Sequence, residues 1–336
     1  MNVDRMNETA QALVADGKGL LAADESTNTI KKRLDQVNVE STEATRRDYR
    51  HLLFTTPGVG RYISGVILYD ETIRQDGPEG VPLIRQIEQA RMIPGIKVDR
   101  GAKPLAPSGT EKVTEGLDGL RERFAEYGEM GARFAKWRAV FSVDGDKPSP
   151  QCIRANAHAL ARYAALAQEA DIAPIVEPEV LMDGTHGINA HREATERVLR
   201  AVFAELAEQD VALEGMLLKP NMILSGKEAE QQAHTAEVAR TTLRTFKRVV
   251  PAAVPGIVFL SGGQTDEQAT RNLDAINQFA GIEGAPWPLS FSFGRALQQA
   301  ALKAWAGDND NADAARQALI ERAQATSAAA QGRAAA

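Results

Sequence analysis

The chain alternates between short, strongly apolar runs and longer segments in which apolar and polar positions are mixed. The short runs are rich in β-branched and aromatic residues, a composition typical of strands that are buried on both faces of a parallel sheet. Eight such runs are predicted to be strands, at residues 19–23, 62–68, 93–98, 134–141, 172–176, 215–218, 256–260 and 287–293.

The longer segments repeat apolar positions at helical spacing and are predicted to be helices. Two of their starts carry capping signals. Ser149 followed by Pro150 predicts a helix over residues 151–167, because proline fits the first helical turn. Thr265 and Gln268 have the spacing of a capping box directly after the seventh predicted strand.

Eight strands that alternate with helices over 336 residues predict an α/β fold, a single (β/α)8 TIM barrel with extra N- and C-terminal helices. An open doubly wound sheet is the alternative, but the glycine fingerprint expected after its first strand is missing. No linker divides the chain, so we expect one domain over residues 1–336. Its alanine-rich end is predicted to be helical from Asn311 to about Gln324, with residues 327–336 as a short mobile tail.

Composition narrows the classes of partner. The net charge of -6 gives no reason to expect nucleic acid or an anionic membrane, because both select for basic surfaces. Residues 1–13 lack the apolar core of a signal peptide, and no apolar run approaches the roughly 20 residues that span a bilayer, so we expect a cytoplasmic protein. The one cysteine, Cys152, permits no intrachain disulfide and is predicted to be a small buried residue rather than a nucleophile.

Polar and ionisable side chains stand where the predicted strands end, which is where barrel enzymes form their active sites. Residues two apart on a strand share a face, so three strands each direct two charges to one side. Burying so many charges is costly unless they pair with one another at the barrel mouth or serve a ligand. The strand-end residues are Asp24, Lys97, Asp99, Lys136, Arg138, Glu177, Glu179, Lys219, Ser261 and Ser292.

One of these lysines has the setting of a nucleophile. An amine attacks a carbonyl only when it is unprotonated, whereas a free lysine has a pKa of about 10.4 that burial and nearby cations lower. Lys219 lies in the most apolar setting of any lysine in the chain, and Lys136 and Arg138 on another strand are available as cationic neighbours. We therefore predict that Lys219 forms a Schiff base, with Lys136 as the alternative.

A Schiff-base mechanism also needs a group that moves protons. Glu177 and Glu179 are the candidates, because two close carboxylates split their proton affinities and one can then hold a proton near neutral pH. The five histidines lack the spacing of a metal site and are predicted to be surface or capping residues. We expect neither a metal nor a cofactor.

Two anion sites are predicted. Loops after the seventh and eighth strands supply glycines, hydroxyls and a cation next to helix starts, in the habitual phosphate position of this fold. A second site is predicted where the helix after the first strand begins, with Lys97 opposite. The first site comprises Ser261, Gly262, Gly263, Ser292, Gly294 and Arg295, and the second comprises Ser26, Thr29, Arg33 and Lys97.

Seven motifs, in this order along the chain, resemble those of class I (Schiff-base) fructose-bisphosphate aldolase. The resemblance extends from about residue 10 to residue 333. The motifs are KGxLAADEST from Lys18, GIKVD from Gly95, FAKWR from Phe134, VEPE from Val176, LLKPN from Leu217, LSGGQ from Leu260 and FSxGRAL from Phe291.

The resemblance implies a metal-independent lyase that reversibly cleaves fructose 1,6-bisphosphate to dihydroxyacetone phosphate and glyceraldehyde 3-phosphate in glycolysis and gluconeogenesis. It implies that Lys219 forms the Schiff base, that Glu177 is its general acid/base, and that Asp24 orients the nucleophile and the hydroxyl at the cleaved bond. Lys136 and Arg138 are implied to form a charged wall beside the reacting carbons. The first anion site would hold the C1 phosphate and the second the C6 phosphate.

Three features of the sequence, two substitutions and the C-terminal end, depart from the animal members of that family. Thr29 replaces a serine but retains the hydroxyl, and Phe293 replaces a tyrosine. The chain ends at Ala336 without the long tyrosine-ended tail that helps to protonate the enamine in animal enzymes. We hypothesise that Glu177 or ordered water supplies this proton, and that the preference between bisphosphate and monophosphate substrates is weaker.

Other functions remain as alternatives. Another Schiff-base barrel, such as a deoxyribose-phosphate aldolase or transaldolase, is disfavoured by the two anion sites, whereas sedoheptulose 1,7-bisphosphate stays open as a parallel substrate. A non-catalytic phosphosugar-binding scaffold would be expected to lack Lys219 or Glu177, and both are present. The partner is expected to be a phosphorylated sugar, and a homotetramer is expected only by analogy with the family.

Overall fold

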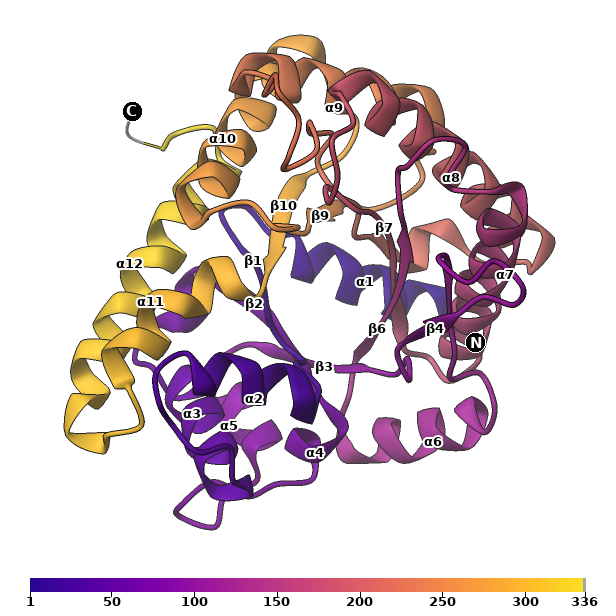
Figure 1. The fold of residues 1–336 in the computed structure, drawn as a ribbon. Helices are drawn as coiled ribbons and strands as arrows, with labels where there is room; N and C mark the ends of the chain where they lie inside the picture. Colours follow the sequence, from indigo (N-terminus) through magenta and orange to yellow (C-terminus); the bar gives the residue numbers. More distant parts are fainter. Residues whose placement is uncertain (335–336) are drawn as a thin grey trace.

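The structure, a computed structural model, describes residues 1–334 as a closed barrel of parallel strands surrounded by helices (Figure 1). The strand order around the barrel is β1-β10-β9-β8-β7-β6-β3-β2, so the predicted TIM barrel is confirmed and the open sheet is wrong. Its strands are β1 (Gly19–Ala23), β2 (Ile63–Leu68), β3 (Ile93–Lys97), β6 (Phe134–Phe141), β7 (Ala173–Val180), β8 (Leu217–Leu218), β9 (Ile257–Phe259) and β10 (Leu289–Phe293).

Each predicted run overlaps one barrel strand, but the bounds of β7 differ in a way that matters for the site. The prediction ended this strand at Val176, whereas β7 pairs with β6 as far as Val180. Glu177 and Glu179 therefore lie within a strand in which every residue is buried. The apolar pattern stops at the first carboxylate because these two side chains face the polar mouth of the barrel rather than its apolar interior.

Helices form the outer layer of the barrel (Figure 1). Ser149 and Thr265 cap their helices as predicted, by accepting hydrogen bonds from the backbone N–H groups of Cys152 and Gln268. A small antiparallel sheet of β4 (Ala102–Pro104) and β5 (Lys112–Thr114) was not predicted. The helices are α1 (Val3–Leu13), α2 (Thr27–Asp35), α3 (Glu43–Phe54), α4 (Asp70–Ile73), α5 (Leu83–Gln89), α6 (Leu120–Met130), α7 (Pro150–Glu169), α8 (Ile188–Glu208), α9 (Thr235–Val249), α10 (Asp266–Glu283), α11 (Arg295–Trp305) and α12 (Ala312–Ala330).

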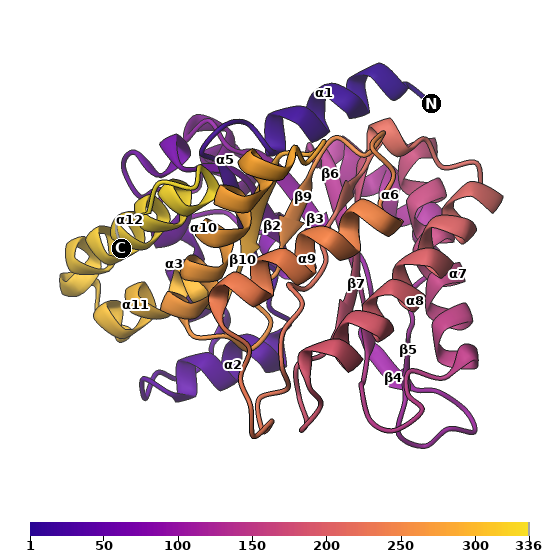
Figure 2. The ribbon, with the colours of Figure 1, turned by 90° about the horizontal axis from the view of Figure 1, so that it is seen from above.

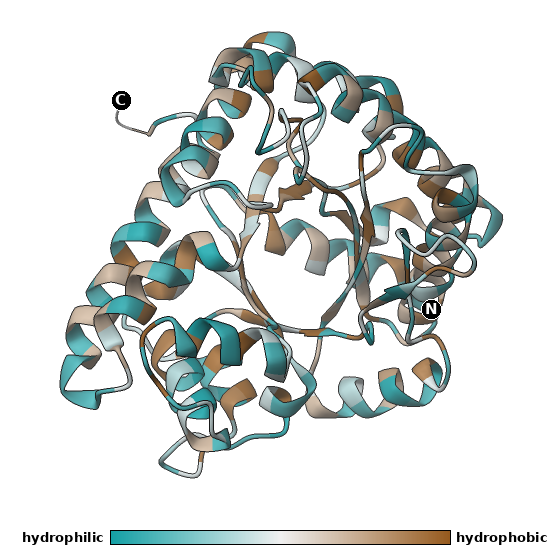
Figure 3. Ribbon diagram, in the orientation of Figure 1, coloured by the Kyte–Doolittle hydropathy of each residue, from teal (hydrophilic) through white to brown (hydrophobic). Residues whose placement is uncertain are grey.

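Helix α1 closes the N-terminal end of the barrel (Figure 2). Met6, Ala10 and Leu13 of this helix pack in one apolar cluster with strand residues such as Phe134 and Val258, all of them buried. The strands and the inner helix faces are apolar, whereas polar residues cover the outer helix faces (Figure 3). The polar mouth of the barrel lies at the end opposite α1.

Two glycines let aromatic rings fill the barrel interior. A Cβ atom on Gly19 would lie 2.7 Å from the ring of Phe291, and one on Gly95 would lie 2.4 Å from the ring of Phe134. These separations are below any normal carbon contact, so the rings occupy the space that side chains on the neighbouring strands would need.

The C-terminal helix extends beyond its predicted end. Helix α12 continues past Gln324 to Ala330 because its small side chains pack closely, with Ala323 and Ala329 fully buried. Ser327 Oγ donates to the carbonyl of Gly17 at 2.5 Å, so residues 327–334 belong to the packed body rather than to a separate tail. Residues 335–336 of the predicted tail lie outside the described part of the chain. No helix within residues 1–334 is long and apolar enough to cross a bilayer.

Candidate active site

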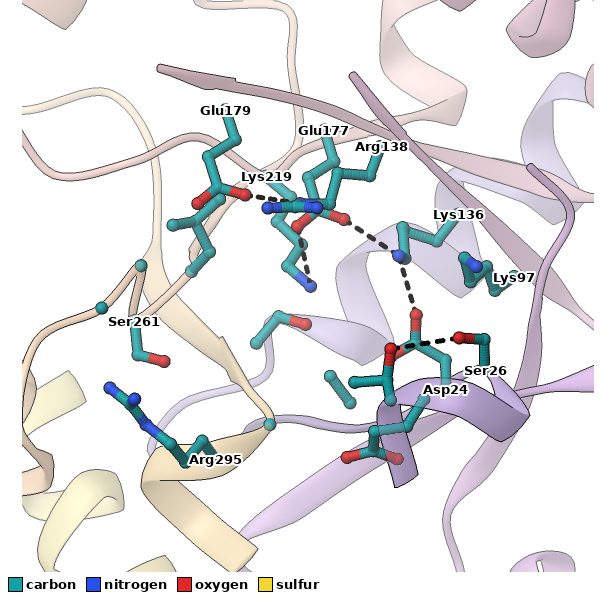
Figure 4. A pocket seen from close by; sticks show the side chains of 18 of the residues that line it. Asp24, Ser26, Lys97, Lys136, Arg138, Glu177, Glu179, Lys219, Ser261 and Arg295 are labelled. Atoms are coloured by element: carbon teal, nitrogen blue, oxygen red, sulfur yellow. Dashed lines mark hydrogen bonds and ion pairs between the residues drawn. The ribbon is translucent and has the colours of Figure 1, made fainter. Parts of the chain in front are cut away.

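The C-terminal ends of the barrel strands surround a cavity of about 370 Å³ (Figure 4). Every residue predicted to take part in catalysis or substrate binding lines this cavity. Asp99 differs from the other strand-end residues because it lines the neighbouring cleft, where it lies 3.4 Å from the amine of Lys97. The lining includes Asp24, Ser26, Thr29, Arg33, Lys97, Lys136, Arg138, Glu177, Glu179, Lys219, Ser261, Gly262, Gly263, Ser292, Gly294 and Arg295.

Lys219 follows β8 directly, and its amine points into the cavity (Figure 4). The side chain is only 5% exposed, and its Nζ lies 3.4 Å from Oε1 of Glu177. Burial lowers the pKa of Lys219, the Glu177 carboxylate opposes this effect, and the Lys136 cation adds to it. The pKa of Lys219 therefore lies below the ordinary lysine value. Such an amine is available to attack a carbonyl.

Lys136, the alternative nucleophile, has the opposite electrostatic setting. Its Nζ lies 2.7 Å from Oδ2 of Asp24 and 3.2 Å from Oε2 of Glu177. Burial lowers the pKa of Lys136, but the two carboxylates outweigh burial and raise this pKa above the ordinary value. Lys136 is thus held as a cation, which favours Lys219 as the nucleophile.

The two carboxylates of β7 contact different cations rather than each other. Glu177 lies between Lys136 and Lys219, whereas Glu179 pairs with Arg138 at 2.5 Å. Burial raises the pKa of Glu177, but the two lysines lower it more, so the net pKa falls below the ordinary value. The expectation of a proton held by mutual repulsion was wrong, because each carboxylate has its own cations. Arg138 is also directed at Glu179, so Lys136 is the cation that lowers the pKa of Lys219.

Asp24 completes the charged centre of the cavity. It follows β1 directly, and its side chain is 13% exposed. Burial raises the pKa of Asp24, but Lys136, Lys219 and Lys97 together hold it well below its usual range. Two carboxylates and two lysines therefore alternate along one line of contacts, from Asp24 through Lys136 and Glu177 to Lys219 (Figure 4).

The loop after β9 has the geometry of an anion site. Gly262 and Gly263 have φ values of +47° and +84°, in the left-handed region that favours glycine. Successive amides in such a loop can form a concavity for an anion. The buried Oγ of Ser292 has no hydrogen-bond partner within residues 1–334. Arg295, the first residue of α11, is held in place because Nη2 donates to the carbonyl of Gln264 at 2.6 Å.

The second predicted anion site lies on the other side of the cavity (Figure 4). Ser26 Oγ and Thr29 Oγ1 lie 3.0 Å apart at the start of α2, where the helix dipole favours an anion. Arg33 from the same helix forms an ion pair with Glu25, and Lys97 also has a carboxylate partner. An anion at this site would have to share both cations with carboxylates.

Glu25 is a cavity residue that the sequence did not single out. Its Oε1 accepts a hydrogen bond from Nε2 of Gln298 at 3.0 Å, and the same amide donates to the carbonyl of Ala22 at 2.7 Å. An acidic residue directly after the strand-end Asp24 was an available clue, although neighbouring residues of an extended segment point to opposite faces. No sequence pattern pointed to Gln298, because it lies 273 residues from Glu25 in the chain.

One histidine was assigned wrongly. His191 is fully buried rather than a surface or capping residue; its Nδ1 accepts from the backbone N–H of Leu224, and its Nε2 donates to the carbonyl of Val180. Burial lowers the pKa of His191 to about 4, so the ring is neutral. Cys152 is buried as predicted, and burial raises its thiol pKa to about 11. Residues 1–334 contain no group of three or more His, Cys, Asp or Glu side chains arranged to hold a metal ion.

Comparison with known proteins identifies the family. A family model described as fructose-bisphosphate aldolase class-I, a glycolytic family, matches residues 5–336. The chain belongs to the class-I fructose-bisphosphate aldolase family. The probable fructose-bisphosphate aldolase class 1 of Xanthomonas campestris pv. campestris is 56% identical over 334 residues, covering 99% of both chains. Fructose-bisphosphate aldolase 1 of Toxoplasma gondii is 53% identical over 95% of this chain and 87% of that protein.

A solved structure gives the same result at the level of the fold. Fructose-bisphosphate aldolase from Plasmodium falciparum, in a complex with TRAP and a small-molecule inhibitor, superposes with a TM-score of 0.97. The two sequences are 48% identical, and the match covers 99% of this chain and 96% of that one. The function predicted from the sequence is therefore confirmed: the chain is a metal-independent lyase, a class-I fructose-bisphosphate aldolase of glycolysis. The comparisons do not support either alternative function.

Proposed function

We propose that Lys219 is the Schiff-base lysine and that the side chains around it divide the remaining steps. Its unprotonated Nζ attacks the C2 carbonyl of fructose 1,6-bisphosphate to form a carbinolamine, which loses water to become an iminium. A base then removes the C4 hydroxyl proton, the C3–C4 bond breaks, and its electron pair passes to the iminium. Glyceraldehyde 3-phosphate leaves, and protonation and hydrolysis of the remaining enamine release dihydroxyacetone phosphate and the free amine.

Glu177 is assigned the proton transfers at Lys219. The distance of 3.4 Å between Oε1 and Nζ lets a proton pass directly or through one water. Because its lowered pKa makes Glu177 a carboxylate in the free site, it first accepts the proton that the attacking amine loses. It then returns that proton to the departing hydroxyl of the carbinolamine.

Asp24 is assigned the C4 hydroxyl. It is ionised and lies at the opposite end of the charged line from Lys219, next to the amine of Lys136 at 2.7 Å. Lys136 stays protonated and stabilises the negative charge that develops on the C4 oxygen as the bond breaks. The pair of Glu179 and Arg138 is assigned to the wall beside the reacting carbons.

The two anion sites are assigned to the two ends of the substrate. Ser261 and Arg295 lie on one side of Lys219, whereas Ser26 and Lys97 lie on the other (Figure 4). This arrangement suits a ketose with a phosphate at each end and a reacting carbonyl between them. We assign the C1 phosphate to the first side, with Gly262, Gly263, Ser292 and Gly294, and the C6 phosphate to the second, with Thr29 and Arg33.

The assignment of Lys219 rests on the opposite shifts of the two lysine pKa values. The pKa of Lys219 lies below the ordinary lysine value, whereas that of Lys136 lies above it. Borohydride reduction in the presence of dihydroxyacetone phosphate, followed by peptide mapping, tests it directly. The label is expected on Lys219, because only an unprotonated amine forms the imine that borohydride reduces. A label on Lys136, or no label at all, would overturn the mechanism.

Glu177 is also proposed to return the proton to the enamine. Exchange of a C3 proton of dihydroxyacetone phosphate into deuterated water measures this step without cleavage of a sugar. Glu177→Gln should slow the exchange strongly, whereas removal of the residues after Arg333 should leave it unchanged. Loss of exchange in the shortened chain would instead assign the proton to the C-terminal residues.

We further propose a single cytoplasmic domain that assembles as a homotetramer. Support comes from the relatives that are described as cytosolic, such as fructose-bisphosphate aldolase 4 of Arabidopsis thaliana, and from family analogy for the assembly. Light scattering of the purified protein tests the tetramer, and a mass of one or two chains would reject it. Cell fractionation tests the location.

A further inference from the structure

A second polar cleft lies at the end of the barrel that α1 closes, away from the active site. It is formed by the turn before β1, the loop between α3 and β2, and the loop between α5 and β3. Its volume is about 580 Å³, within the range of small-molecule sites. Figure 2 shows α5 at the same end of the barrel as α1, whereas α2 of the active site lies at the other end.

All the ionisable side chains that line this cleft are cations. They are Lys18, Arg61 and Arg91, and none of the three forms an ion pair with a carboxylate of residues 1–334. The cleft beside the active site is different, because three carboxylates line it as well, and Arg74 and Lys97 form ion pairs with them. On a chain with a net charge of -6, three unpaired cations in one cleft require a reason.

The three cations are brought together by one backbone contact. A Cβ atom on Gly60 would lie 2.0 Å from the carbonyl oxygen of Ala90, so the two loops touch at these residues. Arg61 and Arg91 are the next residues in their loops, and Nζ of Lys18 donates to the carbonyl of Gly60 at 2.7 Å. The contact thus gathers charges from three separate segments of the chain.

Arg91 occupies a position that disfavours its side chain. Its φ is +61°, in the left-handed region, directly after the end of α5, where glycine or asparagine is usual. Residues with a β-carbon that are kept in such a conformation cluster at functional sites. The fold therefore holds the backbone of Arg91 in one conformation beside the cleft.

The helix dipoles at this cleft offset only part of its positive charge. The C-terminal ends of α3 and α5 border the cleft, and each helix end carries about half a negative charge. Three full positive charges exceed these two partial charges by roughly two units. An anionic ligand with at least two negative charges would offset this excess.

We propose that this cleft binds a small molecule with two adjacent phosphate groups, at a site separate from the active site. The planar fork of arginine matches phosphate oxygens in pairs, so Arg61 and Arg91 would each take one phosphate. The amine of Lys18, which has two further protons to donate, would lie between them.

Inorganic pyrophosphate is the probe for the test. The active site is first filled by borohydride reduction of fructose 1,6-bisphosphate onto chains that carry Asp24→Asn, which by the proposed mechanism form the imine but lack the base that starts cleavage. Both phosphate sides then stay occupied, and the filled wild-type enzyme below is such a chain with an unaltered cleft. Equilibrium dialysis then counts the pyrophosphate bound per chain. One equivalent is expected for the filled wild-type enzyme, and at least tenfold weaker binding is expected for Arg61→Ala and for Arg91→Asn. Asparagine is chosen because it tolerates the left-handed conformation.

Arg85→Ala is the matched control. Arg85 lies on α5 outside the cleft and pairs with Glu88 at 2.7 Å, so its loss changes the net charge equally. Retained binding in this control, with unchanged kcat and KM in at least one cleft variant that has lost pyrophosphate binding, supports the site. The proposal is overturned if the filled wild-type enzyme binds no pyrophosphate, if the cleft variants bind as tightly as wild type, or if the control weakens binding equally. The cleft variants alter separate loops, so one that keeps wild-type kcat is sufficient.

Discussion

Replacing Glu177 by glutamine removes the carboxylate that lies between the two lysines of the active site. Its Oε1 lies 3.4 Å from Nζ of Lys219, and its Oε2 lies 3.2 Å from Nζ of Lys136. At 3.4 Å and an effective dielectric constant of about 20, the attraction between this carboxylate and a protonated Lys219 is about 5 kcal/mol. Glutamine keeps the shape but not the attraction, so the pKa of Lys219 should fall further.

The same substitution removes the group that moves protons in the proposed mechanism. General acid–base catalysis by a positioned side chain contributes about 10²–10⁴-fold, so cleavage should slow by about that factor. The two effects have different signatures. The amine becomes reactive at a lower pH than in the wild-type enzyme, while the maximal rate at any pH is much smaller.

The assay follows imine formation with dihydroxyacetone phosphate by borohydride trapping at short times, from low to high pH. Glu179→Gln is the matched control, because it makes the same change on the same strand at a carboxylate that pairs with Arg138. Its onset pH for imine formation should equal that of the wild type. An onset that is unchanged or higher in Glu177→Gln would refute the argument that this carboxylate holds the proton on Lys219.

Three further substitutions test other parts of the structure. Lys136→Met removes a cation that lowers the pKa of Lys219, so the onset of trapping should move to higher pH; a downward move would contradict the proposed assignment. Gly263→Ala adds a Cβ atom 2.6 Å from a neighbouring lysine Cε at a left-handed position. It should raise KM for the bisphosphate by roughly tenfold, as expected for a lost hydrogen bond to a charged group, and steady-state kinetics would show an effect confined to kcat if this were wrong. Gly95→Ala drives a Cβ atom into the ring of Phe134 and should cost about 1–3 kcal/mol of stability. Urea unfolding measures that loss, and an equally stable variant would show that the barrel interior adjusts freely.

Much of the site could be predicted because a parallel barrel brings all the carboxyl ends of its strands to one rim. A residue that ends one apolar run therefore meets the residues that end the others, as Asp24 and Lys219 do. Glycine loops are also local, since the left-handed conformations of Gly262 and Gly263 are available to glycine in any fold.

The pairing of charges could not be predicted in this way. In the register of β6 and β7, Arg138 lies beside Glu177, yet its guanidinium reaches Glu179. The contact of Glu25 with Gln298 joins the two ends of the chain. The first contact depends on how far an arginine side chain reaches, and the second on two distant segments that meet in the fold. Neither cause leaves a pattern in the sequence.

The sequence by itself determined the barrel, the rim on which the active site forms and the short set of lysines and carboxylates that stand there. These follow from hydrophobic periodicity and strand ends, which are properties of short segments. Only the tertiary structure decided how the charge environments of the two lysines differ. Coulomb interactions depend on the distances between side chains of different strands and on their burial. Those distances place Lys136 between two carboxylates as a lasting cation, and leave Lys219 with one carboxylate and a cationic neighbour, so that its proton is the one most easily lost.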